Sequence, residues 1–185
     1  MVHHDAKIEC PMTERLLLVG MMAVGKTTVG QLSAKRLGWS FLDSDAQLLT
    51  ETGRTAQEIF DTDGDGALRL SESHVLAEAI AHPVPVVIAV AGGAVLSEGN
   101  RALLIRSGVV VWLRASITTL SERVERGGMR PRLGADPARS LRELYLTRHP
   151  LYASVAQFVI DVDDLPPEEV VARIREDTGL GDVER

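Results

Sequence analysis

The sequence predicts an α/β fold, a three-layer sandwich in which one parallel sheet of five strands is covered by helices on both faces. Three observations predict this class. The chain has 185 residues, 45% of them hydrophobic and 25% charged, which suits one globular domain with a sizeable core. Short apolar runs rich in β-branched residues alternate with helical patterns. A glycine-containing turn also joins the first predicted strand to the first predicted helix.

The order of the elements favours parallel strands joined by crossover helices. The expected elements are strands at 15–19 (RLLLV), 40–45 (SFLDSD), 84–90 (VPVVIAV), 109–115 (VVVWLRA) and 157–162 (QFVIDV), with helices at 27–37, 97–108, 116–126 and 166–177. Two segments interrupt the alternation, a helix-turn-helix insert at about 46–82 and a stretch rich in Gly, Pro and Arg at about 127–137. We expect them to be a substrate-binding insert and a mobile lid, because inserts in such folds usually carry these functions.

Composition argues against several functional classes. A net charge of -6 and a pI near 5.4 argue against general binding to nucleic acid or to an anionic membrane. Cys10 is the only cysteine, so one chain can form neither a disulfide nor a Cys-based zinc site, which fits a cytoplasmic protein. The longest apolar run, at 83–96, is shorter than the roughly 20 residues that cross a bilayer. We therefore expect a small-molecule partner.

The two ends of the chain are expected to lie outside the folded domain. Residues 1–13 lack the continuous apolar segment of a secretory signal and are predicted to be a disordered tail. Residues 179–185 are predicted to be a C-terminal tail. A single domain is therefore expected at 14–178.

The most specific motif is GMMAVGKT at Gly20–Thr27, which matches G-x-x-x-x-G-K-[ST] between a predicted strand and a predicted helix. Exposed N–H groups of such a loop wrap phosphate groups, and the helix dipole stabilises their charge. Lys26 can reach the terminal phosphates, and the Thr27 hydroxyl can ligate the magnesium that accompanies a nucleotide. The motif predicts a nucleotide site and a fold of the P-loop NTPase type. The less favoured alternative is a strand-to-helix turn without a ligand.

Two carboxylates follow the second predicted strand in the segment LDSDAQ. The alternation of a strand sends Asp43 and Asp45 to the same side, facing the phosphate site. Such a pair can position magnesium-bound water and can orient, or take a proton from, an attacking hydroxyl. The alternative is structural, with Asp45 as the N-cap of the helix that follows.

Residues 61–72, DTDGDGALRLSE, match the twelve-residue calcium loop D-x-[DN]-x-[DN]-G-x5-E. The flanks are helical in pattern, as a calcium-binding hand requires. Arg69 occupies the ninth position, however, where a calcium loop commonly uses a water-bridging oxygen ligand, so a positive charge would lie beside the dication. No second loop of this pattern exists to pair with it. We therefore favour an Asp/Gly turn between two helices over a calcium site.

Beyond these motifs, the chain resembles shikimate kinases from about Arg15 to Arg175. The resemblance covers the phosphate loop, LGWSFLDSD, GRTAQEIFDTDGDGALRLSE, AGGAVL, MRPRL and TRHPLYASVA, and it extends to their order and spacing. It implies ATP-dependent phosphorylation of the 3-hydroxyl of shikimate to 3-phosphoshikimate, in aromatic amino-acid (chorismate) biosynthesis. It also implies a monomer that uses ATP and Mg²⁺.

The resemblance assigns a role to each candidate residue. Asp45 would hold the attacking hydroxyl, with Lys26 and Arg130 as the other catalytic residues. Thr27, and Asp43 through water, would hold magnesium. The acceptor would be bound by Asp45, by the arginines Arg69 and Arg148 on its carboxylate, and by backbone N–H groups at Gly92 and Gly93. The nucleotide would be bound by Gly20, Ala23, Val24, Gly25, Lys26, Thr27 and Thr28, with Arg123 stacked on adenine and Arg130 closing from the lid.

Four residues depart from the family pattern near the acceptor site. Ala91 replaces the first of three glycines, where its methyl group can crowd the acceptor ring or shift the backbone. Asp65 replaces Glu, Leu68 replaces Phe, and Arg132 replaces a leucine of the lid. Two alternatives to a shikimate kinase therefore stay open. One is a related kinase for another carboxylate-bearing polyol or cyclitol, such as gluconate, and the other is a non-enzymatic nucleotide- or calcium-binding module.

Overall fold

One sheet of five parallel strands forms the centre of the protein. The computed structural model describes residues 14–127 and 136–181. The strand order is β2-β3-β1-β4-β5. The strands are β1 (Arg15–Val19), β2 (Ser40–Asp43), β3 (Val86–Ala89), β4 (Val109–Arg114) and β5 (Phe158–Asp161). Each neighbouring pair is parallel, so all five carboxyl ends lie at the same edge of the sheet. The prediction of a five-stranded parallel sheet is confirmed.

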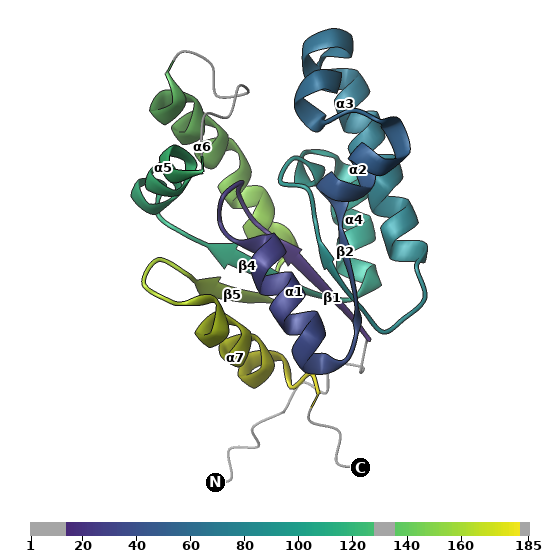
Figure 1. Ribbon diagram of the computed structural model, residues 1–185, viewed down its shortest axis with the longest axis vertical. Helices are drawn as coiled ribbons and strands as arrows, with labels where there is room; N and C mark the ends of the chain where they lie inside the picture. The colour runs from purple at the N-terminus through teal and green to yellow at the C-terminus, as the bar shows by residue number, and fades with distance from the viewer. Residues whose placement is uncertain (1–13, 128–135, 182–185) are drawn as a thin grey trace, which may run out of the picture.

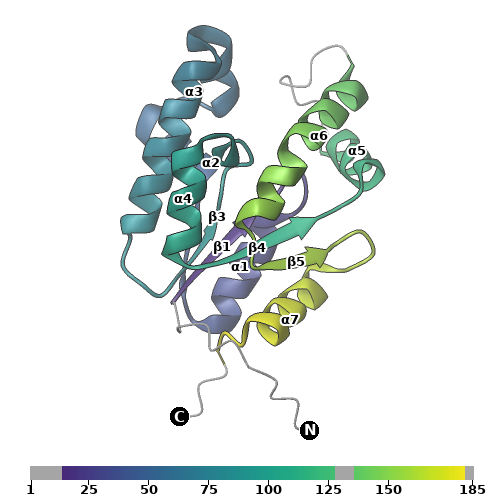
Figure 2. The ribbon, with the colours of Figure 1, turned by 180° about the vertical axis from the view of Figure 1, so that it is seen from behind.

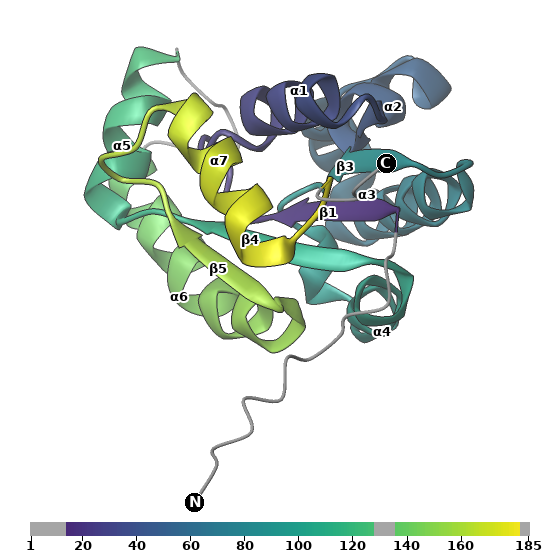
Figure 3. The same cartoon turned by 90° about the horizontal axis from the view of Figure 1, so that it is seen from below.

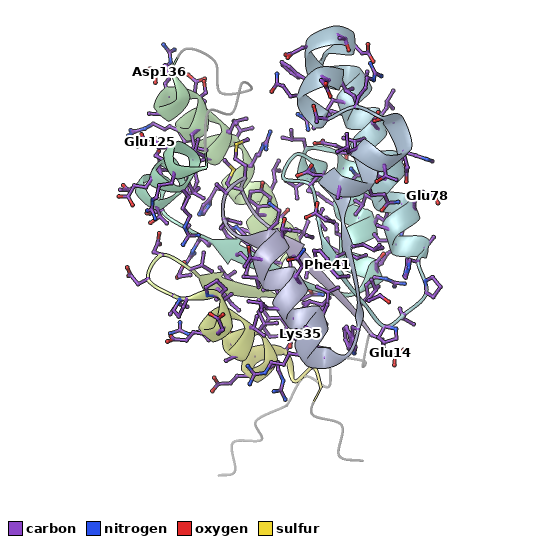
Figure 4. All side chains as sticks on the ribbon, in the orientation of Figure 1. Glu14, Lys35, Phe41, Glu78, Glu125 and Asp136 are labelled. Atoms are coloured by element: carbon purple, nitrogen blue, oxygen red, sulfur yellow. The ribbon has the colours of Figure 1, made fainter. Side chains whose placement is uncertain are left out.

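The central strands β1, β3 and β4 are apolar on both faces because helices cover both sides of the sheet. Helices α1 (Lys26–Leu37) and α7 (Pro167–Thr178) lie on one side, and α4 (Glu98–Ser107) and α6 (Pro137–Val155) lie on the other (Figure 3). In Figure 4 the Phe41 side chain of β2 lies beside α1. Its ring packs so closely on Gly30 that an added Cβ there would lie 2.5 Å from a ring carbon. Small residues on α1 therefore let this helix approach the sheet.

Two pairs of helices rise beyond the carboxyl edge of the sheet (Figures 1 and 2). On the side of β2, α2 (Ser44–Thr52) packs against α3 (Ala56–Ala81) around a small second core. On the opposite side, α5 (Ile117–Arg126) packs against the first part of α6. The single 3-10 turn of the described residues, η1 (Ala94–Leu96), follows β3. The start of β1 and the end of α7 lie at the other end of the molecule (Figure 1).

The predicted insert at 46–82 forms α2 and α3, and α3 is divided by a kink at Gly64, whose φ of 85° and ψ of 176° are not helical. The calcium-like segment 61–72 is thus mostly helical. The start of α3 is fixed by a capping box: the Thr55 hydroxyl accepts from the N–H of Glu58, and the Glu58 carboxylate accepts from the N–H of Thr55. These contacts act to lower the pKa of Glu58, the backbone hydrogen bond from Thr55 most strongly.

The largest differences from the sequence-based expectations concern the end of β2, helix α6 and the C-terminal tail. The second strand ends at Asp43, two residues earlier than predicted, because Asp43 caps helix α2. The 19-residue helix α6 was not predicted as a helix, since Pro150 lies inside it. Leu180, placed in the expected C-terminal tail, is buried in the main core. Among the described residues, no helix combines the length and hydropathy needed to span a membrane.

Candidate functional site

A cavity of about 500 Å³ opens at the carboxyl edge of the sheet, between the phosphate loop and the helices that rise beyond it. Its walls come from five regions of the chain: the phosphate loop with the start of α1, the end of β2 with α2, the start of α3, the turn after β3, and α6. The lining includes Lys26, Thr27, Thr28, Asp43, Asp45, Gly92, Gly93 and Arg148. Most of the predicted site residues are therefore brought to one place.

The phosphate loop runs from the end of β1 to the start of α1. Gly20 passes so close to β4 that an added Cβ would lie 2.5 Å from the carbonyl oxygen of Leu113. Gly25 is the N-cap of α1 with φ 104°, a left-handed conformation that favours glycine. The Lys26 ammonium donates to the carbonyl oxygens of Gly20 (2.9 Å) and Met21 (3.0 Å), so it lies across the loop. Ala23 and Gly25 line the cavity, whereas Gly20 and Val24 lie behind its wall.

A hydrogen bond between Thr27 and Asp43 links the phosphate-loop end of α1 to the end of β2. The Thr27 hydroxyl donates to Asp43 Oδ2 at 2.6 Å. The other oxygen, Oδ1, accepts from the N–H groups of Asp45 (2.9 Å) and Ala46 (3.3 Å). Asp43, rather than Asp45, is thus the N-cap of α2. Both aspartates line the cavity as expected, but strand alternation does not put them there, because Asp45 lies in the first turn of a helix.

Arg69 lies beside the cavity and is held by two carboxylates. Its guanidinium contacts Glu72, whose side chain is 3% exposed, and donates to Asp65 Oδ1 at 2.8 Å. Burial acts to lower the pKa of Arg69, but the two carboxylates outweigh burial and raise it above its ordinary value. A Cβ added at Gly93 would overlap the Arg69 guanidinium. Gly93 therefore makes room for this ion pair, a reason that differs from the predicted approach of its N–H to the acceptor.

Arg148 lies on α6 and lines the cavity, although only 3% of the residue is exposed. Its Nε has no hydrogen-bond partner within the described residues. One turn further along the helix, the buried Tyr152 hydroxyl donates to the carbonyl oxygen of Gly92 at 2.7 Å. Burial raises the pKa of Tyr152 to about 12, although the nearby Arg148 acts to lower it. A positively charged group is thus fixed at the wall of the cavity, facing the turn after β3.

Two of the departures from the family pattern lie outside the cavity wall. Ala91 is 5% exposed and is not part of the lining, so its methyl group does not crowd the cavity. Leu68 is fully buried in the small core between α2 and α3. Asp65 contacts Arg69, as described above. The remaining departure, Arg132, lies outside the described residues, as do Arg130 and most of the predicted lid at 127–137.

Arg123 joins three parts of the chain on the other side of the phosphate loop. It lies on α5, and its guanidinium donates to the carbonyl oxygens of Val24 (3.1 Å) and Val162 (2.9 Å). Arg123 is therefore held by two backbone carbonyl groups and is not simply presented to water by its helix. Its predicted stacking on adenine is not tested by these contacts.

The calcium-like segment does not gather its carboxylates. Asp61 accepts from Gln57, Asp63 pairs with Arg54, and both Asp65 and Glu72 pair with Arg69. Among the described residues, no group of three or more His, Cys, Asp or Glu side chains is arranged to hold a metal ion. The structure thus gives the calcium hypothesis no support.

Two residues of this site received no role from the sequence. Glu72 and Tyr152 both belong to segments that carry the family resemblance, but their contacts with Arg69 and Gly92 depend on tertiary structure. Thr55, Ala56 and Gln57, at the start of α3, also line the cavity. They lie in the predicted insert and in a segment that carries the family resemblance, but neither gave them a role.

These features together define a P-loop kinase for small molecules. They are the parallel sheet, the phosphate loop after its first strand, the aspartates at the end of its second strand and the arginine at the cavity wall. The family model for shikimate kinase matches residues 22–178. The chain belongs to the shikimate kinase family.

Individual relatives agree with this assignment. Over 160 residues the chain is 42% identical to a shikimate kinase of Ruegeria pomeroyi, covering 86% of this chain and 82% of that protein. It is 44% identical over 160 residues to a shikimate kinase of Pseudomonas syringae pv. tomato, covering 86% and 92%. The structure of the Acinetobacter baumannii shikimate kinase in complex with shikimate superposes with a TM-score of 0.86 at 33% identity, covering 94% of this chain and 97% of that one.

Proposed function

We propose that this enzyme transfers the γ-phosphoryl group of ATP to the 3-hydroxyl of shikimate, giving 3-phosphoshikimate and ADP in aromatic amino-acid biosynthesis. One observation carries the proposal: a single cavity is lined by Lys26 of the phosphate loop, by Asp45 and by the buried Arg148. The acceptor must present a hydroxyl to Asp45, beside the phosphates that Lys26 binds, and an anion to Arg148. A hydroxylated ring acid meets both demands.

The acceptor hydroxyl is oriented by Asp45, which lies in the first turn of α2 at the cavity wall. The hydroxyl oxygen attacks the γ-phosphorus as the bond to the β–γ bridging oxygen breaks. The hydroxyl proton passes to the Asp45 carboxylate, and ADP leaves with the bridging oxygen. Lys26 offsets the negative charge on the phosphates. Arg130 is proposed to add a second positive charge from the predicted lid, and Arg123 to stack on the adenine.

The acceptor carboxylate is bound by arginines, because planar guanidinium groups bind carboxylates through paired hydrogen bonds. Arg148 is already at the wall, and its Nε has no hydrogen-bond partner in the described part of the chain. Arg69 has one buried partner, Glu72, and one partner that is 59% exposed, Asp65. We propose that Arg69 exchanges Asp65 for the acceptor carboxylate and keeps its bond to Glu72. The glycine turn would supply backbone N–H groups to the ring hydroxyls.

The residues at the phosphate loop also suit a magnesium ion. Thr27 and Asp43 bring a hydroxyl and a carboxylate to 2.6 Å of each other, and oxygen donors are the ligands that Mg²⁺ prefers. Thr27 would bind the ion directly and Asp43 through water. When bound, the ion neutralises phosphate charge and fixes the phosphates for transfer.

Three further parts of the proposal concern the whole chain. The folded domain, predicted at 14–178, would extend to Leu180, which is buried in the main core. The protein would act as a monomer, as the family resemblance implies, and it would work in the cytoplasm. Size-exclusion chromatography with light scattering measures the oligomeric state, and a mass of 20.1 kDa is the expected result.

Mass spectrometry of the products tests the reaction. Protein incubated with MgATP and shikimate should convert shikimate to a product heavier by one phosphoryl group, with ADP formed in equal amount. Added EDTA should stop the conversion. ADP formed without phosphorylated shikimate would overturn the proposed acceptor, because it would mean transfer to water.

A further inference from the structure

Tyr152 lies where three parts of the candidate site meet. It is 1% exposed and follows Arg148 by four residues on α6, so the two side chains share one face of the helix. Its hydroxyl donates to the carbonyl oxygen of Gly92 at 2.7 Å, and it lies 3.8 Å from the sulfur of Met21 in the phosphate loop. One phenol therefore contacts the turn after β3 and the phosphate loop.

The same phenol lies beside the Arg148 guanidinium. A Cβ built on Gly92 would lie 3.5 Å from the Tyr152 oxygen and 3.6 Å from Arg148 Nη1, so both groups flank one point. A guanidinium can only donate hydrogen bonds, and the phenol proton is already directed to Gly92. The phenol oxygen is thus placed to accept from Arg148, and the nearby charge of Arg148 acts against the burial that raises the pKa of Tyr152.

The ring of Tyr152 is held independently of its hydroxyl. Its centroid lies 5.8 Å from that of the buried Trp112 on β4, which also meets the ring of His149 edge-on at 4.7 Å. Removal of the hydroxyl would therefore leave the ring in place. It would leave the carbonyl of Gly92 without this donor and Arg148 without this acceptor.

We propose that Tyr152 is a positioning residue that orients Arg148 toward the carboxylate of the acceptor. This inference rests on the proposed function. Arg148 has a long side chain with several rotatable bonds, and it must present its donors at one point of the wall. Its Nε has no partner among the described residues, so no hydrogen bond at Nε fixes the direction of the guanidinium. The phenol oxygen supplies one such contact, and the bond to Gly92 fixes the phenol relative to the turn after β3.

The test compares Tyr152→Phe with Tyr145→Phe. Tyr145 is the other of the two tyrosines, lies on the same helix and is half-buried against His149. Tyr152→Phe should raise the KM for shikimate about tenfold, the usual effect of losing a hydrogen bond to a charged group, and should leave kcat and the KM for ATP within about twofold. Tyr145→Phe should leave all three values unchanged. Thermal melting and calorimetry with ATP check that both variants fold and keep the phosphate site.

A double-mutant cycle separates orientation of Arg148 from general packing. Arg148→Lys should raise the KM for shikimate strongly by itself, because an ammonium cannot form the paired contacts of a guanidinium. Adding Tyr152→Phe to that variant should raise the KM by less than about twofold, because the arginine that the phenol orients is gone. The full tenfold effect in both backgrounds would contradict the proposal.

The outcomes are distinguishable. Shikimate turnover by the wild type with an unchanged KM in Tyr152→Phe would overturn the role of Tyr152 and leave the proposed function intact. A loss in Tyr152→Phe that falls equally on shikimate and ATP would also overturn it, since general loosening of the site would explain the result. No shikimate turnover by the wild type would overturn both.

Discussion

Ala23 is the one residue other than glycine with a positive φ in the described parts of the chain. Its φ of 61° lies in the left-handed region, where a Cβ meets the neighbouring backbone. The residue lies in the phosphate loop and lines the cavity, so a strained conformation is retained where phosphates are expected to bind. Glycine would adopt this backbone conformation without that strain.

Replacing Ala23 by glycine should therefore stabilise the protein. The removed strain outweighs the added freedom of the unfolded chain, and we expect a gain of about 0.5–1 kcal/mol. The melting temperature, measured with and without ATP, should rise by about 2 °C in this chain. A lower melting temperature for Ala23→Gly in both conditions would show that the Ala23 methyl group contributes packing that exceeds its strain.

Asp45 and Asp43 have different structural roles, which predicts different variants. Asp45→Asn keeps the shape of the residue and removes the negative charge, so kcat should fall about 10²- to 10⁴-fold as the hydroxyl loses its base. ATP affinity by calorimetry should change by less than about twofold, because the phosphate loop is untouched. Normal turnover by Asp45→Asn would remove this carboxylate from the mechanism.

Single residues also show where sequence reasoning reached its limit. The sequence predicted that Asp43 and Asp45 lie at the phosphate site, and both line the cavity. The prediction was possible because they lie at the end of a strand whose carboxyl end is at the same edge of the sheet as the phosphate loop. It did not distinguish the capping aspartate from the one in the first turn, since either fits the segment LDSDAQ. It also gave Gly93 a role in binding, whereas the ion pair packed over it is visible only in three dimensions.

At the scale of elements, the kink at Gly64 divides α3 into two helical segments that contribute different residues to the site. The first segment starts at the cavity with its capping box, and the second carries Arg69 and Glu72. The sequence predicted an Asp/Gly turn between two helices here, and the non-helical conformation of Gly64 agrees with it. The kink is shorter than a calcium loop, because the residues on both sides of Gly64 remain helical.

Two glycines in α3 should respond to alanine in opposite ways. Gly64 has φ 85° and Gly66 is helical, and neither would bring an added Cβ within 4 Å of another group. Gly64→Ala should destabilise by about 1 kcal/mol or more because alanine resists a positive φ, while Gly66→Ala should stabilise by about 0.5–1 kcal/mol. Urea unfolding measures both. Stabilisation by both substitutions would mean that α3 is a continuous helix in solution.

Helix α6 is the element of the site that the sequence did not predict. It carries Arg148 and Tyr152, yet no helix was predicted there, because Pro150 interrupts the pattern that identifies one. Its start does carry a signal, an Asp136 N-cap followed by Pro137. The strands were easier to predict from the sequence than α6. Both faces of a central parallel strand are buried, so its sequence is continuously apolar.

At the scale of the whole molecule, ion pairs and caps at the carboxyl edge make stability depend on pH. Arg114 donates to both oxygens of Asp161, linking β4 to β5, and this hydrogen bonding lowers the pKa of Asp161 from its ordinary 3.8. For Asp163, burial acts to raise the pKa, but hydrogen bonds from Thr119 and Ser116 lower it overall. A carboxylate with a lowered folded-state pKa stabilises the fold above its unfolded value and loses that contribution as the pH falls.

The urea midpoint should therefore stay level from pH 7 to 5 and fall as the pH drops below about 4. Asp161→Asn should have a lower midpoint at pH 7 and a shallower fall in acid, because its share of the pH dependence has been removed. An identical acid dependence in Asp161→Asn and the wild type would mean that the pair with Arg114 does not persist in solution.

The central claim is that one cavity joins a nucleotide to a hydroxylated ring acid. The most direct measurement is kcat/KM for shikimate and for gluconate by coupled ADP release with MgATP, with a control lacking an acceptor. Shikimate should exceed gluconate by about 100-fold or more, because the arginines and Asp45 must be satisfied together by one rigid acceptor. Equal values for the two acceptors, or ADP release that ignores both in protein that still binds ATP, would contradict the account.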